Sequence, residues 1–248
     1  METASKDVLF TIAMDLDLPD LLKWCSSKSR INRDVCQNDN VWRSKLLKDF
    51  PEGYPDYEKF NLNRSLRETY IFMYQLSYIK KLLKTKESLY DIFMMKKINL
   101  SNKGLTKVPA FDLPNLQVLY LYNNKLRSVP AFDLPNLHEL NLCNNNLTKL
   151  PAWNLPNLQI LSLSSNNLKM PTFKHPNLEY LSLYNNNLTE VSVFDLPNLQ
   201  VLYLSDNNLT EIPTFHLPKL KILHLQNNKL SEVTKKELMK KYNNKINL

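Results

Sequence analysis

The chain has 248 residues, a formal net charge of +8 and a hydrophobic content of 43%, which is enough for a sizeable core. It contains only two glycines, so neither a G-x-G-x-x-G nor a G-x-x-x-x-G-K-[ST] loop can be written, which argues against the usual nucleotide sites. The charge is uneven: residues 1–94 hold 15 Lys and Arg against 14 Asp and Glu, and residues 95–248 hold 17 against 10.

The three cysteines, Cys25, Cys36 and Cys143, are widely spaced and have no C-x-x-C pair. This pattern predicts neither a disulfide framework nor a zinc site, so we expect a reducing compartment, the cytoplasm. Residues 1–10 lack a basic segment followed by an apolar core, and no run approaches the roughly 18 apolar residues of a membrane span. We therefore expect no membrane insertion, no metal and no cofactor.

Residues 1–50 predict a small all-α domain. Apolar residues at helical spacing from Val8 to Leu16 indicate a first helix. Leu18-Pro19-Asp20 then restarts the chain into a second helix, and residues 31–36 form a third. Three short helices cannot bury all of these apolar residues, so part of the surface is expected to need a partner.

The run from residue 7 to residue 46 resembles an F-box. It has an acidic opening, an L-D-x-x-D-L-L centre at residues 16–22 and a closing D-x-V-W-R at residues 39–43. It departs from the family at Ala4 and Ser5, where Leu-Pro is usual, and around Ile31 and Asn32, where a second tryptophan is usual. The resemblance implies docking on the Skp adaptor of a Skp–cullin–F-box ubiquitin ligase. The implied adaptor-binding residues are Val8, Leu9, Ile12, Leu16, Leu18, Pro19, Leu21, Leu22, Val41 and Trp42.

Two alternatives stay open for this segment. Val41 and Trp42 would either close the domain or contact the adaptor, and the whole segment could instead be a helical cap whose apolar residues form its own core. Residues 51–94 predict a helical linker, because apolar residues between 64 and 95 fall near one helix face. No Gly/Ser-rich hinge interrupts it, so we expect a rigid coupling to the C-terminal part of the chain.

From residue 95 onward the chain is repetitive. The pattern L-x-x-L-x-L-x-x-N-x-L occurs six times at a step of about 21 residues, which is the signature of a leucine-rich repeat (LRR). The sequence therefore predicts an α+β two-part chain: an F-box-like domain at 1–50, a helical linker at 51–94 and an LRR solenoid with a curved parallel β-sheet at 95–248. The six registers begin at Leu116, Leu137, Leu158, Leu178, Leu199 and Leu220.

Several columns of the repeat are interpreted as structural. An asparagine column from Asn124 to Asn228 offers donors and acceptors to buried turns, and an aromatic column from Phe111 to Phe215, including Phe194, predicts a stacked spine on the convex side. At the ends we expect a degenerate first coil, a last helix with capping-box spacing at Thr234 and Glu237, and an edge strand at 245–248.

The variable strand positions remain to carry recognition on the concave face. Tyrosine is common in protein interfaces, so this face predicts a protein target; the alternative is that tyrosine merely suits an exposed strand. The face has almost no net charge, which makes nucleic acid a poor ligand. The predicted target-binding residues are Tyr120, Tyr122, Glu139, Asn141, Tyr180, Tyr184, Tyr203 and His224.

Together these features predict a substrate receptor of a Skp–cullin–F-box ubiquitin ligase. The alternative is an LRR interaction scaffold with no link to ubiquitination. We expect no enzyme, because no His/Asp/Ser set or carboxylate pair has a spacing beyond chance. The repeats, rich in Lys, Asn and Tyr, also resemble proteins of large amoeba-infecting DNA viruses, which would place the receptor in the cytoplasm or nucleus of a host cell.

Overall fold

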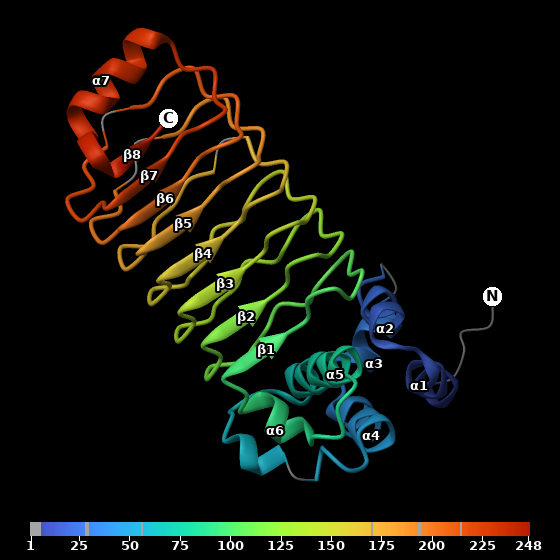
Figure 1. Cartoon of the computed structure of the whole chain (residues 1–248). Coiled ribbons are helices and arrows are strands. Elements are labelled where there is room, and N and C mark those ends of the chain that lie inside the picture. Colours follow the sequence, from blue (N-terminus) through green and yellow to red (C-terminus); the bar gives the residue numbers. More distant parts are fainter. Residues whose placement is uncertain (1–5, 28–29, 56, 170, 193–194, 214) are drawn as a thin grey trace. The chain divides into compact units, whose positions relative to one another are not determined.

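The computed structural model describes residues 6–27, 30–55, 57–169, 171–192, 195–213 and 215–248, with the backbone alone at 6–9, 12 and 30–32 (Figure 1). The chain divides into two compact units, Met1–Phe93 and Met94–Leu248. The predicted domain at 1–50 and the predicted linker at 51–94, except for its last residue, thus belong to one helical unit.

The helical unit is built from short helices with clear start signals. Asp17 caps the second helix by accepting a hydrogen bond from Asp20 N (3.0 Å), and Asn38 caps the fourth. Ser65 and Glu68 form a full capping box at the longest helix. The elements are α1 (Lys6–Asp15), α2 (Leu18–Cys25), α3 (Arg30–Cys36), α4 (Asp39–Asp49), η1 (Tyr57–Phe60), α5 (Leu66–Leu83) and α6 (Leu89–Phe93).

The core of this unit lies where α4 meets α5. Trp42 is 1% exposed, and its indole N–H donates to Cys36 O (2.7 Å). Its ring centroid lies 5.7 Å from that of Tyr70. A second aromatic group joins Phe60 and Phe72, whose rings meet edge-on at 5.4 Å. These contacts bury the large side chains that a small helical unit needs.

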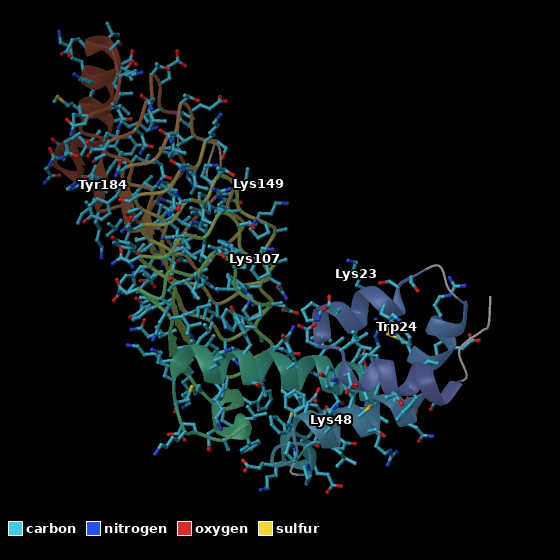
Figure 2. All side chains as sticks on the ribbon, turned by 90° about the vertical axis from the view of Figure 1, so that its right-hand side faces the viewer. Lys23, Trp24, Lys48, Lys107, Lys149 and Tyr184 are labelled. Carbon is cyan, nitrogen blue, oxygen red and sulfur yellow. A yellow bond between two sulfur atoms is a disulfide. The ribbon has the colours of Figure 1, made fainter. Side chains whose placement is uncertain are left out.

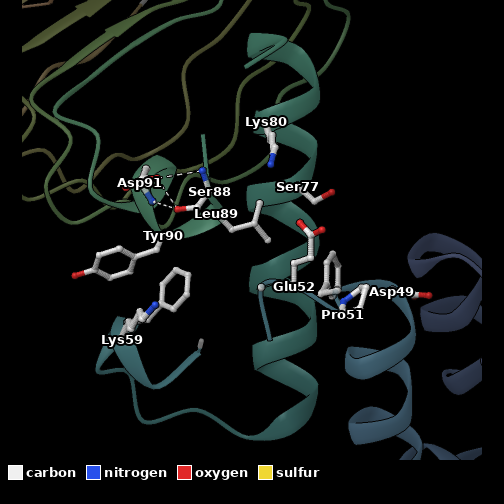
Figure 3. A pocket seen from close by; sticks show the side chains of 13 residues that line it. Asp49, Pro51, Glu52, Lys59, Ser77, Lys80, Ser88, Leu89, Tyr90 and Asp91 are labelled. Carbon is white, nitrogen blue, oxygen red and sulfur yellow. Dashed lines mark hydrogen bonds between the residues drawn. The ribbon is translucent and has the colours of Figure 1, made fainter. Parts of the chain in front are cut away.

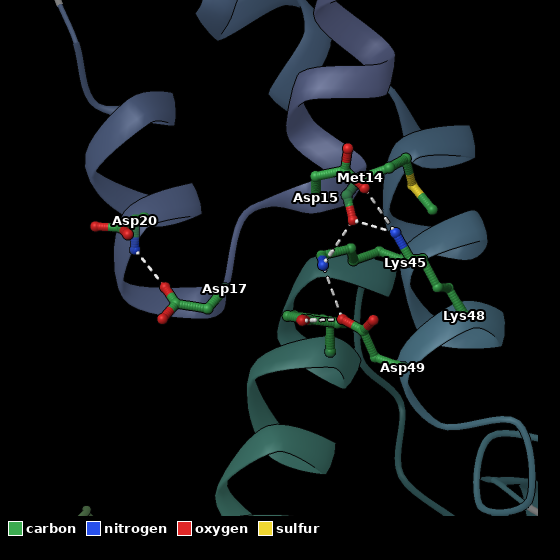
Figure 4. Close-up of polar contacts among 8 residues, drawn as sticks. Met14, Asp15, Asp17, Asp20, Lys45, Lys48 and Asp49 are labelled. Carbon is green, nitrogen blue, oxygen red and sulfur yellow. Dashed lines mark hydrogen bonds and ion pairs between the residues drawn. The ribbon is translucent and has the colours of Figure 1, made fainter.

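A polar network ties the end of α1 to α4 and α5 (Figure 4). The buried Lys45 ammonium pairs with Asp49 (2.9 Å) and donates to Met14 O (3.0 Å). Asp49 also accepts from the Tyr70 hydroxyl (2.6 Å), and Lys48 pairs with Asp15 (2.9 Å). Burial, followed by the hydrogen bond to Asp49, raises the pKa of Tyr70. The buried charge of Lys45 is therefore matched, as a buried ammonium requires.

The prediction that the cysteines form no disulfide is wrong. Cys25 and Cys36 are bonded, with their Cα atoms 5.7 Å apart. The bond joins the last residue of α2 to the last residue of α3. Residues 11 apart in sequence come together only because the chain turns back between these helices, which spacing alone does not reveal. Cys143 is the free cysteine.

We expect reduction of this disulfide to lower the free energy of unfolding of the helical unit by about 3 kcal/mol, because an 11-residue separation is released in the unfolded chain. The measurement is urea unfolding with and without dithiothreitol in a Trp153→Phe variant, so that Trp24 and Trp42 report on this unit alone. A Cys143→Ser variant controls for the remaining thiol. Superimposable curves would contradict the prediction.

The solenoid is one parallel sheet whose eight strands follow chain order (Figure 1). Each full coil gives a three-residue strand whose central residue is buried, so the register is one repeat per strand. This confirms the predicted solenoid and the final edge strand. The strands are β1 (Lys97–Asn99), β2 (Val118–Tyr120), β3 (Glu139–Asn141), β4 (Ile160–Ser162), β5 (Tyr180–Ser182), β6 (Val201–Tyr203), β7 (Ile222–His224) and β8 (Ile246–Asn247).

The asparagine column joins neighbouring coils by hydrogen bonds. The Asn145 amide donates to Leu121 O (3.0 Å) and Leu142 O (3.1 Å), while its carbonyl accepts from Leu126 N (3.1 Å). One side chain thus satisfies buried backbone groups of two coils, as predicted. The pattern recurs at Asn124, Asn166, Asn186, Asn207 and Asn228.

Two further ladders were not predicted. The residue before each ladder asparagine is left-handed, and Asn144 donates to Asn123 one coil away. Asn and Asp tolerate this conformation, so the N-N dipeptide of the repeat carried the signal. In the L-P-N motif, Asn136 donates to Pro114 O (2.8 Å), which fastens the convex turns. The left-handed column is Asn102, Asn123, Asn144, Ser165, Asn185, Asp206 and Asn227.

The convex spine includes a histidine. Phe111, Phe132 and Trp153 follow one another at ring distances of 5.7 and 6.1 Å, and Trp153 then stacks on the buried His175. Phe194 lies outside the described residues. Burial lowers the pKa of His175 below its ordinary value of 6.5. The neutral ring is therefore the form that the folded chain holds.

This burial predicts a pH effect. Above pH 6.5, neutral His175 makes its full contribution to the free energy of unfolding. This contribution declines as the pH falls from 6.5 toward the lower pKa of the folded state, because the unfolded chain then binds the proton more tightly than the folded chain does. Leucine occupies this position in other coils, so His175→Leu should remove that step from a plot of urea midpoint against pH. His216→Gln, at an exposed histidine, should keep it. An unchanged step in His175→Leu would refute the assignment.

The last helix caps the solenoid, but its start differs from the prediction. Helix α7 (Glu232–Tyr242) is capped by Ser231, whose hydroxyl accepts from Thr234 N (3.1 Å). The capping residue thus precedes Thr234 by three positions, because Ser231 directly follows the buried Leu230 of the last coil. Leu238 and Tyr242 are buried, so α7 covers the end of the core.

Candidate functional site: the concave face of the solenoid

The concave face consists of ordered rows of side chains, because the strands pair in register. Tyr120 stands beside Asn141, and Ser182 stands beside Tyr203, which is followed by His224. A neighbouring row on the same face runs from Val118 to Ile222 and is mainly apolar. The structure therefore places all eight predicted target-binding residues on one face, but in two groups.

The first group lies on β2 and β3. The rings of Tyr120 and Tyr122 are 6.2 Å apart, and the Lys97 ammonium lies 4.8 Å from the Tyr120 ring centroid. Burial raises the pKa of Tyr120, and its hydrogen bond with Glu139 raises it further. The side-chain carbonyl of Asn141 already accepts a hydrogen bond within its own coil, from Cys143 N (3.0 Å). These polar groups are largely matched within the face.

The second group surrounds a hollow over β4 to β7. Tyr180 lies 5.7 Å from Tyr203, whose ring meets His224 edge-on at 4.8 Å, so three rings form a continuous wall. Tyr184 is 44% exposed and projects from the strand side of the solenoid (Figure 2). The hollow has a volume of about 520 Å³. Its lining residues are Ser164, Tyr180, Ser182, Tyr184, Tyr203, Ser205, Asp206, His224, Gln226 and Asn227.

The floor of this hollow was not predicted from the sequence. Ser182 and Ser205 are buried even though they belong to the concave face. The longer tyrosine side chains that line the same hollow extend beyond them. The Ser164 and Ser182 hydroxyls are 2.6 Å apart, and Ser205 donates to Gln226 Oε1 (2.7 Å). The available signal was serine in two neighbouring columns: Ser182 in the column of Tyr120 and Tyr203, and Ser164 and Ser205 in the column of Tyr122 and Tyr184. Small hydroxyl side chains below aromatic walls create a recess suited to an inserted side chain.

The predicted adaptor-binding residues are divided between the core and the surface of the helical unit. Leu18, Leu21, Val41 and Trp42 are buried in the helical unit, which favours the alternative in which they form its own core. Their apolar periodicity reflected internal packing. The side chains of Val8, Leu9 and Ile12 lie outside the described residues. Pro19 is exposed and Leu16 and Leu22 are half-buried, so three of the predicted contacts are on the surface.

Helix α2 presents further surface beside these positions. Trp24 is half-buried and Lys23 is exposed, and both are seen on this helix in Figure 2. On α4, Leu47 is 50% exposed. The helical unit thus keeps an apolar surface on α2, although it is smaller than the sequence predicted.

A second hollow, of about 530 Å³, lies within the helical unit between α5 and α6 (Figure 3). Ser88 caps α6 by accepting from Asp91 N (3.0 Å), and the Asp91 carboxylate accepts from Ser88 N in return (3.1 Å). Asp49 is held by Lys45 and Tyr70. Two of its carboxylates therefore serve the fold. The concave hollow is the stronger candidate for recognition.

Comparison with known proteins identifies the class. The family model described as "Leucine Rich repeats (2 copies)" matches residues 94–134, 135–175, 176–207 and 197–237. These matches span more than half of the chain, which therefore belongs to the leucine-rich repeat family. No curated protein sequence matches it significantly.

Solved structures agree on the fold. An LRR protein of Leptospira interrogans is 28% identical with a TM-score of 0.52, and the match covers 64% of this chain and 50% of that one. InlP of Listeria monocytogenes is 34% identical with a TM-score of 0.50, covering 54% and 40%. The chain thus matches half or less of the length of either structure. The chain is therefore a leucine-rich repeat solenoid.

Membrane spans and metal clusters are both absent from the part of the chain that the structure describes. No helix among the described residues is both long enough and apolar enough to cross a membrane. Where side chains are described, no group of three His, Cys, Asp or Glu residues is arranged to hold a metal ion.

Proposed function

We propose that the chain is a non-catalytic receptor that holds a protein target on the concave face of its solenoid. The observation that carries the proposal is the hollow over β4 to β7, where a wall of Tyr180, Tyr203 and His224 stands above buried serines. Tyrosine rings that are partly exposed, as Tyr180 and Tyr203 are, are typical of interface anchors. Recessed polar groups beside them can receive a side chain of the partner.

The test is a quantitative pull-down from lysate of the source cell with the full chain as bait. A Tyr180→Ser, Tyr203→Ser double variant should lose its specific partners by about tenfold or more, since two anchor rings are removed. A Lys107→Ser, Lys149→Ser double variant, altered on the side of the connecting loops, should retain them (Figure 2). Equal recovery by all three baits would reject the concave face as the binding surface.

We further propose that the helical unit docks a Skp-type adaptor of a ubiquitin ligase, so that the solenoid presents its target for modification. Support comes from the F-box-like motif and from the surface of α2 around Pro19 and Leu22. The chemistry would then belong to other subunits. Burial of Trp42 favours the alternative in which the closing tryptophan stabilises the domain, leaving docking to α2 and its surroundings.

Isothermal titration of purified adaptor into the full chain tests this docking. Leu22→Arg should weaken binding by about tenfold or more, because a charge would be placed in an apolar contact. Leu47→Arg is the matched control: it is also a leucine on a helix of the same unit, 50% exposed and outside the predicted contacts. No detectable heat with the wild-type chain, or equal affinity of both variants, would leave a scaffold without a ubiquitin role.

Such a receptor would work in the cytoplasm or nucleus, in a host cell if the chain is viral. The Cys25–Cys36 disulfide stands against that location, since cytosolic thiols are kept reduced. Acid quenching of intact cells, followed by thiol alkylation in denaturant and mass spectrometry, decides between the two, because both cysteines are buried in the folded chain. Alkylated Cys25 and Cys36 would support the cytoplasm, and a protected pair would place the chain in an oxidising compartment.

A further inference from the structure

Charge along the solenoid is concentrated in blocks. Residues 175–218 contain five acidic residues and no Lys or Arg. The flanking stretches are basic, with nine Lys and Arg against three Asp and Glu at 94–174, and eight against two at 219–248. The acidic block supplies β5 and β6, the central strands of the concave hollow. The hollow therefore lies in the acidic part of a basic solenoid.

One carboxylate of this block lines the hollow. Among its lining residues, all of which the structure describes, Asp206 is the only acidic one, and none is Lys or Arg. Asp206 occupies the left-handed column with φ of 55°, where five other coils have asparagine. Its carboxylate accepts from Asn227 Nδ2 (2.9 Å), and a carboxylate has capacity for further donors. Asp206 thus replaces the usual asparagine of this column at the coil where the hollow forms.

The aromatic walls of the hollow add a preference for the shape of the bound cation. Tyr180, Tyr203 and His224 form a continuous aromatic surface, and Tyr184 is exposed beside it. A planar guanidinium stacks on tyrosine faces and donates in a fork to a carboxylate, whereas an ammonium is a compact point charge. The floor offers hydroxyl oxygens at Ser164, Ser182 and Ser205 as further acceptors. This combination favours a flat cation over a neutral or anionic group.

We propose that the hollow binds an arginine side chain of the target, with the guanidinium against the tyrosine wall and paired with Asp206. This deepens the proposed function and rests on it: the concave face holds a protein, and the hollow selects a segment of that protein with an arginine. The surrounding acidic block would attract a cationic segment, and the basic flanks would disfavour further positive charge.

The test uses the purified full chain with tyrosine rings labelled for NMR. The probes are Nα-acetyl-arginine methylamide, its citrulline counterpart, which keeps the shape without the charge, and its lysine counterpart. Titration of the arginine probe should shift the ring signals of Tyr180, Tyr184 and Tyr203. Citrulline should bind about tenfold more weakly, because a charge-assisted pair is lost. The lysine probe should also bind more weakly than arginine.

Asp206→Asn places the residue of the other coils at this position, so the backbone remains compatible. We expect it to weaken arginine binding by about tenfold, to the level of citrulline. Asn144→Asp is the matched control, since it adds the same acid to the same column outside the hollow and should leave arginine binding unchanged. Unfolding midpoints of both variants verify the fold.

The inference would be overturned by equal titration with arginine and citrulline, by lysine binding as tightly as arginine, or by an Asp206→Asn variant that binds like wild type. Absence of ring shifts with every probe would overturn it as well. These outcomes are separable from failure of the proposed function. If Tyr180→Ser, Tyr203→Ser abolishes target capture while Asp206→Asn does not, the concave face binds the target and the arginine assignment alone is wrong.

Discussion

Replacing Asn145 by alanine is expected to lower the free energy of unfolding of the solenoid by about 3–5 kcal/mol, because several buried backbone groups lose their partners together. Its side chain serves Leu121 O, Leu142 O and Leu126 N, which belong to two adjacent coils. Alanine can form none of these hydrogen bonds. Asn145 is only 7% exposed, so water cannot replace its side chain as a partner. The effect is cooperative, since coils are stabilised mainly by their neighbours.

Urea unfolding followed by hydrogen exchange and mass spectrometry of peptides from residues 94–248 measures this effect in the solenoid alone. Asn146→Ala is the control: the neighbouring asparagine is exposed and should change the unfolding free energy by less than about 0.5 kcal/mol. A small effect at Asn145, equal to that at Asn146, would mean that the ladder does not hold the coils together.

Trp42→Ala should destabilise the helical unit by about 3–5 kcal/mol, which is the usual cost of removing a buried tryptophan. The indole fills the space beside Tyr70, and its N–H bond to Cys36 O connects α4 with the end of α3. The Arg67 guanidinium also lies 5.9 Å from the Trp42 ring. Truncation would leave a cavity and an unpaired carbonyl together.

Trp24→Ala provides the comparison, because it removes the same side chain from a half-buried position in the same unit. We expect a cost of about 1 kcal/mol there. Thermal unfolding followed by tryptophan fluorescence in a Trp153→Phe background isolates the helical unit, because the remaining tryptophan lies in that unit. If Trp42→Ala kept full stability and lost only adaptor binding, Trp42 would be a contact residue and its core assignment would be wrong.

The solenoid was predictable because its information is periodic. Leucines at a 21-residue step determine which residues face inward, and the register of Leu119, Leu140 and Leu161 is set directly by that step. The asparagine ladder was also accessible, since a buried turn needs both a donor and an acceptor at one position. The same step placed the eight predicted residues on the concave face, and their contact with a target stays a prediction.

The features that escaped prediction depend on neighbours distant in sequence. The bond between Cys25 and Cys36 requires the turn between α2 and α3. The burial of Leu21 and Val41 depends on how the helices pack, which helical periodicity does not distinguish from a docking surface. The hollow arises because Ser182 pairs with the equally small Ser162 on one side and with the larger Tyr203 on the other, so its depth is a property of several repeats together. Recognition sites are thus harder to predict than the scaffold that holds them.

Photo-crosslinking from the concave face tests the central claim most directly. A benzoylphenylalanine placed at Tyr184, exposed at the hollow, should crosslink a target protein in cells, and the product should disappear in the Tyr180→Ser, Tyr203→Ser background. The same group at Lys149, on the side of the connecting loops, should give no such product (Figure 2). Crosslinks from Lys149 to the same partner, or from Tyr184 that survive loss of the tyrosine wall, would contradict recognition through the concave face.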